Sequence, residues 1–320
     1  MAWIFITIVL LMRVVQNVLG KSAAKLTPNH SIGYLKHNAF YMWLAAVPAL
    51  ILFIISIIGQ SGELYFGKTL LYASLSGLAL GVSSCCSLYA LSNGTMVLNS
   101  LFGTAGLLVP SIAGIFLYEE YLTVWQYIAI VIFIIGAYFL MGNSKTVYGK
   151  FTLKTLLILI LNLVMNGVTM LSQTMFARSL PDGNVSFFSL LSFAAGAIAL
   201  SIILGVLYLA VYKCKDKPVD ETVVQSFVLI PKPGKELKLD RKVYIYSIFL
   251  AVAVFLVSQL ITLCASTVSP VILFSITCGG STIISSIVGT TVYKEKFTKE
   301  TAIGLILGIG ALVMIKVFAI

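Results

Sequence analysis

Apolar runs of about 20 residues recur along the chain of 320 residues, and short polar stretches separate them. A helix of roughly that length crosses a hydrocarbon core about 30 Å thick. The pattern therefore predicts an all-α integral membrane protein with ten transmembrane helices. These lie near residues 2–22, 38–59, 68–91, 94–117, 123–142, 152–176, 186–212, 243–267, 270–293 and 299–319.

Composition and charge agree with this prediction. Hydrophobic residues make up 59% of the chain and charged residues 10%, whereas a soluble domain carries about 25% charged residues. Of the 21 Lys and Arg residues, 17 fall in odd-numbered loops counted from the N-terminus, which places both chain ends outside by the positive-inside rule. We expect a multi-pass protein of the cell (plasma) membrane whose partner is the lipid bilayer and not a nucleic acid.

The two halves of the sequence repeat each other. SLYALSNGTMVLNS (87–100) aligns without gaps to TLCASTVSPVILFS (262–275) at a constant offset of 175 residues. Because each half holds five spans, an odd number, the second half enters the membrane inverted. Inverted repeats are typical of secondary transporters, whose substrate site lies between the repeats near the membrane midplane. We expect a first repeat at 1–142, a linker at 143–151 and a second repeat at 152–320 with a long hydrophilic loop at 213–242.

A Y-x-E-x-[LF]-T motif lies between the last two spans of each repeat. Glu120 aligns with Glu295, and Thr123 aligns with Thr298. Each Thr is predicted to cap the helix that follows, and each Glu to interact favourably with a helix N-terminus. A role of the two acids in proton coupling is the alternative.

The first span, Met1 to about Leu19, contains a cation. Arg13, Gln16, Asn17 and Gly20 are spaced so that they share one helix face. A guanidinium inside a membrane costs several kcal/mol unless it is paired or hydrated, so this face contacts protein or a water-filled cavity. Arg13 is therefore either a charged group on the wall of a transport cavity or a residue that ties helices together.

None of the 11 acidic residues falls at the centre of a predicted span, so Arg13 lacks a protein counter-ion there. An anionic group on a substrate would supply one, because the guanidinium fork suits carboxylate or phosphate. The sixth span, which is the repeat partner of the first, places Asn166 opposite Arg13. Such intramembrane polar residues either line the cavity or bond helices to one another. The further candidates for substrate binding are Tyr89, Asn99, Gln173, Gln259 and Thr262.

The sequence resembles the drug/metabolite transporter superfamily, and within it the EamA-like ten-helix transporters. The segments that carry the resemblance are YEEYLTVWQYIAIVIFIIGAYFL and YKEKFTKETAIGLILGIGALVMI, each at the close of a repeat. The first helix is also similar to that of the small multidrug resistance proteins, in which a membrane-embedded glutamate binds cation and proton in turn. Arg13 occupies the matching position here, which reverses the charge of the site. The resemblance also implies that both termini lie in the cytoplasm, opposite to the Lys and Arg count.

Enzymatic functions are disfavoured. His30 and His37, the two histidines, are assigned to the first loop, and no nucleophile motif or acid cluster occupies a span. We expect no enzyme activity, no metal site and no cofactor. Gly304 and Gly308 have the spacing of close helix contacts, inside the protein or in a homodimer.

Together these features predict a secondary-active or facilitative carrier of a small polar metabolite with an anionic group, such as an amino acid or organic carboxylate. Because no central carboxylate is present, export or exchange without strong proton coupling is favoured. The alternatives are a multidrug or cationic-amine exporter, a channel, or a membrane scaffold without transport activity.

Overall fold

The computed structural model describes residues 2–28, 31–60, 62–94, 96–110, 112–113, 123–148, 153–213, 240–265, 268, 273, 275–295 and 298–317. Within these ranges the chain is helical, and its β structure is one isolated bridge between Glu63 and Gly183. The helices are α1 (Ala2–Leu26), α2 (Ser31–Ile58), α3 (Phe66–Asn93), α4 (Met96–Ala105), α6 (Val124–Tyr148), α7 (Leu153–Ser179), α8 (Val185–Lys213), α10 (Arg241–Ala265), the π-helical segment η2 (Ser275–Gly279), α12 (Gly280–Thr291) and α13 (Lys299–Val317).

Six of these helices are long and apolar enough to cross a membrane: α1, α2, α3, α7, α8 and α10. Their outward faces carry large apolar side chains. On α2, for example, Ile51, Ile55 and Ile58 are exposed on the surface of the bundle. Exposed apolar surface of this extent is unusual for a soluble protein and fits contact with lipid.

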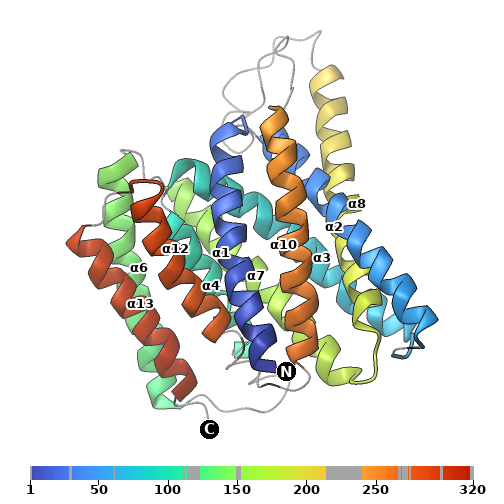
Figure 1. The fold of residues 1–320 in the computed structure, drawn as a ribbon. Coiled ribbons are helices and arrows are strands. Elements are labelled where there is room, and N and C mark those ends of the chain that lie inside the picture. Colours follow the sequence, from blue (N-terminus) through green and yellow to red (C-terminus); the bar gives the residue numbers. More distant parts are fainter. Residues whose placement is uncertain are drawn as a thin grey trace.

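The helices of the two halves have corresponding neighbours. In Figure 1, α6 lies beside α13 on one side of the bundle, and α2 lies beside α8 on the other. Between them, α1 packs on α10 as α7 packs on α3, and α1 contacts α12 as α7 contacts α4. If each helix is replaced by its counterpart in the other half, each of these contacts therefore corresponds to another contact that the structure contains. The polar face of α1 and that of α7 both lie in the interior between the halves.

The fourth and ninth predicted spans are interrupted. The helix α4 has ten residues, and the chain turns at Gly106 and Leu107. A Cβ atom on Gly106 would lie 2.9 Å from the backbone nitrogen of Gly167, so the turn sits where α4 crosses α7 at close range. In the ninth span, the π-helical turn η2 precedes α12. Both irregular segments lie within predicted spans, and in the fourth span the break occurs where Gly106 and Gly167 let two backbones approach closely.

Glycines also set the closest helix contacts. A Cβ atom on Gly77 of α3 would lie 2.0 Å from the carbonyl oxygen of Ser192 in α8. A Cβ atom on Gly136 of α6 would lie 2.9 Å from the backbone nitrogen of Gly308 and 3.0 Å from the carbonyl oxygen of Gly304. The Gly304 and Gly308 pair predicted to mediate close packing is therefore used inside the bundle, between α6 and α13.

Two predicted boundaries differ near the first loop. The helix α2 begins at Ser31, seven residues before the predicted span, so His37 lies within a helix and is 1% exposed. Its assignment to a loop is wrong. The polar run Lys36, His37 and Asn38 resembles a loop, but tertiary contacts bury the last two. Outside the described residues lie His30, Glu120 and most of the 213–242 loop.

Candidate functional site: a polar pocket around Arg13

A pocket with a cavity volume of about 110 Å³ lies in the interior between the halves. Side chains from α1, α2, α3, α4, α7, α10 and α12 line it, and most of them are polar. The volume accommodates several water molecules or a small ligand. Five of the residues predicted to bind substrate line this pocket, namely Arg13, Gln16, Asn17, Asn99 and Asn166.

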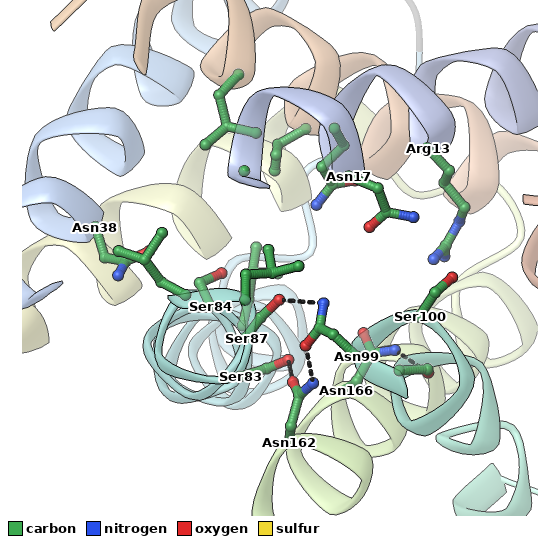
Figure 2. Close-up of a pocket in the computed structure, with 18 of the residues that line it drawn as sticks. Arg13, Asn17, Asn38, Ser83, Ser84, Ser87, Asn99, Ser100, Asn162 and Asn166 are labelled. Atoms are coloured by element: carbon green, nitrogen blue, oxygen red, sulfur yellow. Dashed lines mark hydrogen bonds between the residues drawn. The ribbon is translucent and has the colours of Figure 1, made fainter. Parts of the chain in front are cut away.

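Arg13 is the cation of this pocket. Figure 2 shows its side chain extending from α1 across the pocket toward Ser100 on α4. The Nε atom is buried and has no hydrogen-bond partner among the described residues. The described residues also include no acid in the lining of this pocket. Arg13 is half-buried as a whole, and a cation that the described residues leave without a counter-ion is stabilised when an anion binds beside it.

A chain of hydrogen bonds forms one wall of the pocket (Figure 2). Asn99 of α4 donates to Ser87 Oγ of α3 at 2.9 Å and accepts from Asn162 Nδ2 of α7 at 3.3 Å. Ser83 donates to the oxygen of the same Asn162 amide at 2.7 Å. These four side chains satisfy one another and join three helices, so Asn99 bonds helices together as well as lining the cavity.

The remaining polar residues of α1 and α7 differ in their partners. Asn17 Nδ2 donates to Ser285 Oγ of α12 at 2.9 Å. Asn166 Nδ2 donates to the carbonyl oxygen of Gly103 at the end of α4. The amide of Gln16 borders the pocket and makes no hydrogen bond with the described part of the chain. Gln16 is thus available to a ligand, whereas Asn17 and Asn166 already hold helices together.

His37 of α2 also borders the pocket, which the local sequence around it does not predict. Its Nδ1 lies 3.1 Å from Ser247 Oγ of α10. Its Nε2 is buried and has no hydrogen-bond partner in the described part of the chain. The Nε2 of His37 and the Nε of Arg13 are the two buried side-chain polar atoms without a partner among the described residues, and both belong to residues of this pocket.

A buried ion pair lies in the last two turns of α1, where Lys21 directly follows Gly20 of the pocket lining. Lys21 Nζ is 3.2 Å from Glu295 Oε1, and both side chains are 4% exposed. Lys21 also donates to the carbonyl oxygens of Leu91 at 2.9 Å and Gly94 at 2.8 Å, where α3 ends. The two oxygens of Glu295 accept the backbone N–H of Met96 at 3.0 and 3.1 Å. The carboxylate therefore caps α4, a helix of the other half.

Tyr293 adds a second link between the halves at this end. Its hydroxyl donates to the carbonyl oxygen of Val18 at 2.7 Å and lies 2.7 Å from Ser22 Oγ. The ammonium of Lys25 lies 4.7 Å from the centroid of the same ring. Because the first half supplies Val18, Ser22 and Lys25, these contacts join the two halves at this end of the bundle.

The other predicted site residues lie elsewhere. Gln259 and Thr262 line a second hollow of about 580 Å³ near the turns that follow α2 and α7. Gln259 accepts from Ser189 at 2.7 Å and donates to Ser186 at 3.1 Å, so α8 and not the central pocket holds its amide. Gln173 donates to Ser258 at 3.2 Å, and Tyr89 packs edge-on against the ring of Tyr34.

The cap residues of the repeat motif take positions near helix starts. Thr298 Oγ1 accepts the backbone N–H of Thr301 at 3.4 Å, in the first turn of α13. Thr123 directly precedes α6, and its carbonyl oxygen accepts the N–H of Tyr127 at 3.3 Å. In the described part of the chain, no group of three or more His, Cys, Asp or Glu side chains could hold a metal ion.

Comparison with known proteins informs the fold only. No family model matches the chain, and no curated protein matches its sequence. One solved crystal structure, described only as that of a protein, is similar with a TM-score of 0.58 and 12% identity. The alignment covers 99% of this chain and 97% of the other chain. The whole helical arrangement is therefore one that a known structure shares.

Proposed function

We propose that this protein is a ten-helix transporter of the drug/metabolite transporter superfamily that carries a small polar metabolite with an anionic group. Arg13 is the observation on which the proposal rests. Its guanidinium borders a polar pocket between the halves, and its buried Nε has no partner in the described part of the protein. A carboxylate or phosphate on the ligand supplies the missing counter-ion through two parallel hydrogen bonds.

The membrane setting of the proposal is supported by the outer surface. Six helices are long and apolar enough to cross a bilayer, and large apolar side chains cover their outward faces. Polar side chains gather instead in the interior, where they either bond to one another or border the pocket. A protein with an apolar exterior and a polar interior cavity is suited to moving a polar solute through lipid.

The pattern of helix contacts supports alternating access. Corresponding helices of the two halves have corresponding neighbours, as an inverted repeat requires. Helices α4 and α12 end or begin in irregular backbone, which is frequent around the binding sites of transporters. In this mechanism the two halves rock against each other, and the pocket opens first at one end of the bundle and then at the other.

The Lys21 and Glu295 ion pair lies where such a motion would act. It joins the end of α1 in the first half to the segment between α12 and α13 in the second. Opening the pocket at this end separates the two residues and exposes both to water, which lowers the cost of parting them. No carboxylate lines the central pocket among the described residues, so we propose facilitated export or exchange without strong proton coupling.

Uptake of a panel of radiolabelled metabolites into proteoliposomes tests the proposal. We expect saturable uptake of at least one carboxylate by the wild type, and a loss of about tenfold or more in Arg13→Gln and Arg13→Ala. Arg178→Gln is the matched control, because it makes the same substitution at an exposed residue at the end of α7. Equal carboxylate uptake by wild type and both Arg13 variants would refute the charge-pairing idea.

The same panel separates the alternatives. Uptake of organic cations but not of anions would indicate a multidrug or amine exporter. Flux that rises in proportion to solute concentration without saturation would indicate a channel. Absence of flux for every solute would indicate a scaffold or receptor.

A further inference from the structure

His37 is a nearly fully buried residue of the pocket lining, and one of its polar atoms is unused. Its side chain is part of α2, is 1% exposed, and borders the cavity. The large majority of buried side-chain polar atoms in proteins have a partner, so an exception requires an explanation. The partnerless atom is Nε2.

The hydrogen bonds of Ser247 assign the tautomer of the ring. The Ser247 hydroxyl donates its one hydrogen to the carbonyl oxygen of Val243 at 2.8 Å. With the hydroxyl hydrogen on this shorter bond, Ser247 Oγ is an acceptor toward His37, and Nδ1 of the ring donates to it at 3.1 Å. In a neutral imidazole with a proton on Nδ1, Nε2 carries a lone pair and accepts a hydrogen bond. The unused atom of His37 is thus a hydrogen-bond acceptor.

His37 and Arg13 belong to different walls of the pocket. The partner of His37 is Ser247 of α10, whereas Arg13 extends toward Ser100 of α4. In Figure 2, Asn38, the neighbour of His37 in α2, lies at the opposite side of the pocket from Arg13. The pocket lining therefore includes a cation from α1 and a residue with an unused hydrogen-bond acceptor from α2.

We propose that His37 is a specificity-determining residue of this pocket: its Nε2 accepts a hydrogen bond from an O–H or N–H group of the ligand, remote from the anion that Arg13 binds. The inference rests on the proposed function, since it assumes an anion at Arg13. The pocket then selects hydroxylated or aminated acids over simple acids of the same length. A simple acid has no donor for Nε2 and leaves this buried acceptor without a partner. The simple acid therefore binds more weakly than an acid that carries an O–H or N–H group.

Matched acids test this selectivity on the full chain purified in detergent. The probes are butyrate and its 2-, 3- and 4-hydroxy derivatives, which share the carboxylate and place the O–H donor at increasing distance from it. Calorimetric titration should show at least one hydroxy acid binding about fivefold tighter than butyrate, as expected for one added hydrogen bond. In His37→Asn the amide can still donate to Ser247 but has no group at the Nε2 position. We expect the preference to disappear in this variant while butyrate affinity changes less than about twofold.

Ser247→Ala provides the second variant. It keeps His37 but removes the acceptor that holds the proton on Nδ1, so the preference should shrink. Ser201→Ala is its control, because Ser201 also bonds a main-chain carbonyl of its own helix but lies outside the pocket lining. If His37→Asn does not fold, the comparison of these two serine variants decides the question.

The outcomes separate the two proposals. Arg13-dependent binding of all four acids with equal affinity would overturn the role of His37 and leave the anion site standing. An unchanged preference in His37→Asn, or in Ser247→Ala where that variant decides, would do the same. Binding of none of the acids by wild type, with none of the metabolite panel transported, would overturn both.

Discussion

Two cations of the same helix have opposite surroundings. Lys21 and Arg13 are eight residues apart on α1, about 12 Å along its axis. Lys21 is paired with Glu295 and donates to two main-chain carbonyl oxygens. Arg13 borders a cavity, and its buried Nε makes no hydrogen bond within the described structure.

Lys21 is a charge that the fold pairs with an acid, whereas Arg13 is a charge without an acid beside it among the described residues. Every charge placed inside a membrane protein costs free energy, and Lys21 offsets that cost with a built-in acid and helix-end carbonyls. The described residues provide Arg13 with no such compensation. Under the proposed function, an anion that binds at Arg13 would compensate this cost.

The largest expected effect follows from removing Lys21. In Lys21→Met the carboxylate of Glu295 remains buried without its cation, and we expect the unfolding free energy to fall by about 3–5 kcal/mol. Chemical unfolding in detergent, followed by far-UV circular dichroism, measures this change. The double variant Lys21→Met/Glu295→Gln should recover most of the loss, because it leaves no unpaired charge. Arg13→Gln should be as stable as wild type or more stable, and a loss of several kcal/mol there would contradict the contrast between the two cations.

The amides of the pocket should show the same contrast with a smaller effect. Asn99→Ala removes the partner of both Ser87 and Asn162, so we expect a loss of about 1–3 kcal/mol in unfolding free energy. Gln16→Ala removes a side chain without partners in the described structure, and we expect a change under about 0.5 kcal/mol. The same unfolding measurement compares them. Equal losses in both variants would mean that partnering does not distinguish structural from ligand-facing amides.

The smallest effect is expected from Arg13→Lys. This variant keeps the positive charge but loses the planar fork that binds a carboxylate through two bonds. We expect about a fivefold weaker affinity for the transported carboxylate, an intermediate value between wild type and Arg13→Gln. Calorimetric titration measures it. Affinity equal to wild type would show that charge alone matters at this position.

The helical fold could be predicted because a helix that crosses a membrane requires a long run of hydrophobic residues. A described helix falls in each of the ten predicted spans, and six of these helices have the length and apolarity to cross a membrane. The interruption after α4 was missed, since a run such as LFGTAGLLVP is as apolar as a continuous helix. Where Gly106 meets Gly167 depends on how two helices cross, and no local pattern contains that information.

The sequence predicts which residues of the site share a helix face, but not which other helices that face contacts. The face of Arg13, Gln16 and Asn17 was identified from periodicity, and all three border the pocket. Periodicity does not say which neighbour a face meets, and for this reason Gln259 was assigned to the central cavity although α8 binds its amide. His37 was missed because its burial depends on α2 packing against α10. The sequence does contain a signal for the pairing of Lys21 with Glu295, because both residues lie at the ends of predicted spans on the same side of the membrane.

The central claim is that the partner of Arg13 is the ligand. Its most direct test is the affinity of the transported carboxylate for purified wild type and Arg13→Gln, measured by calorimetric titration at the same pH and salt concentration. The account predicts that affinity falls by about 10- to 100-fold in Arg13→Gln, the contribution of a charge-assisted hydrogen-bonded pair, while the unfolding free energy does not fall. Unchanged affinity in a folded Arg13→Gln protein would contradict it.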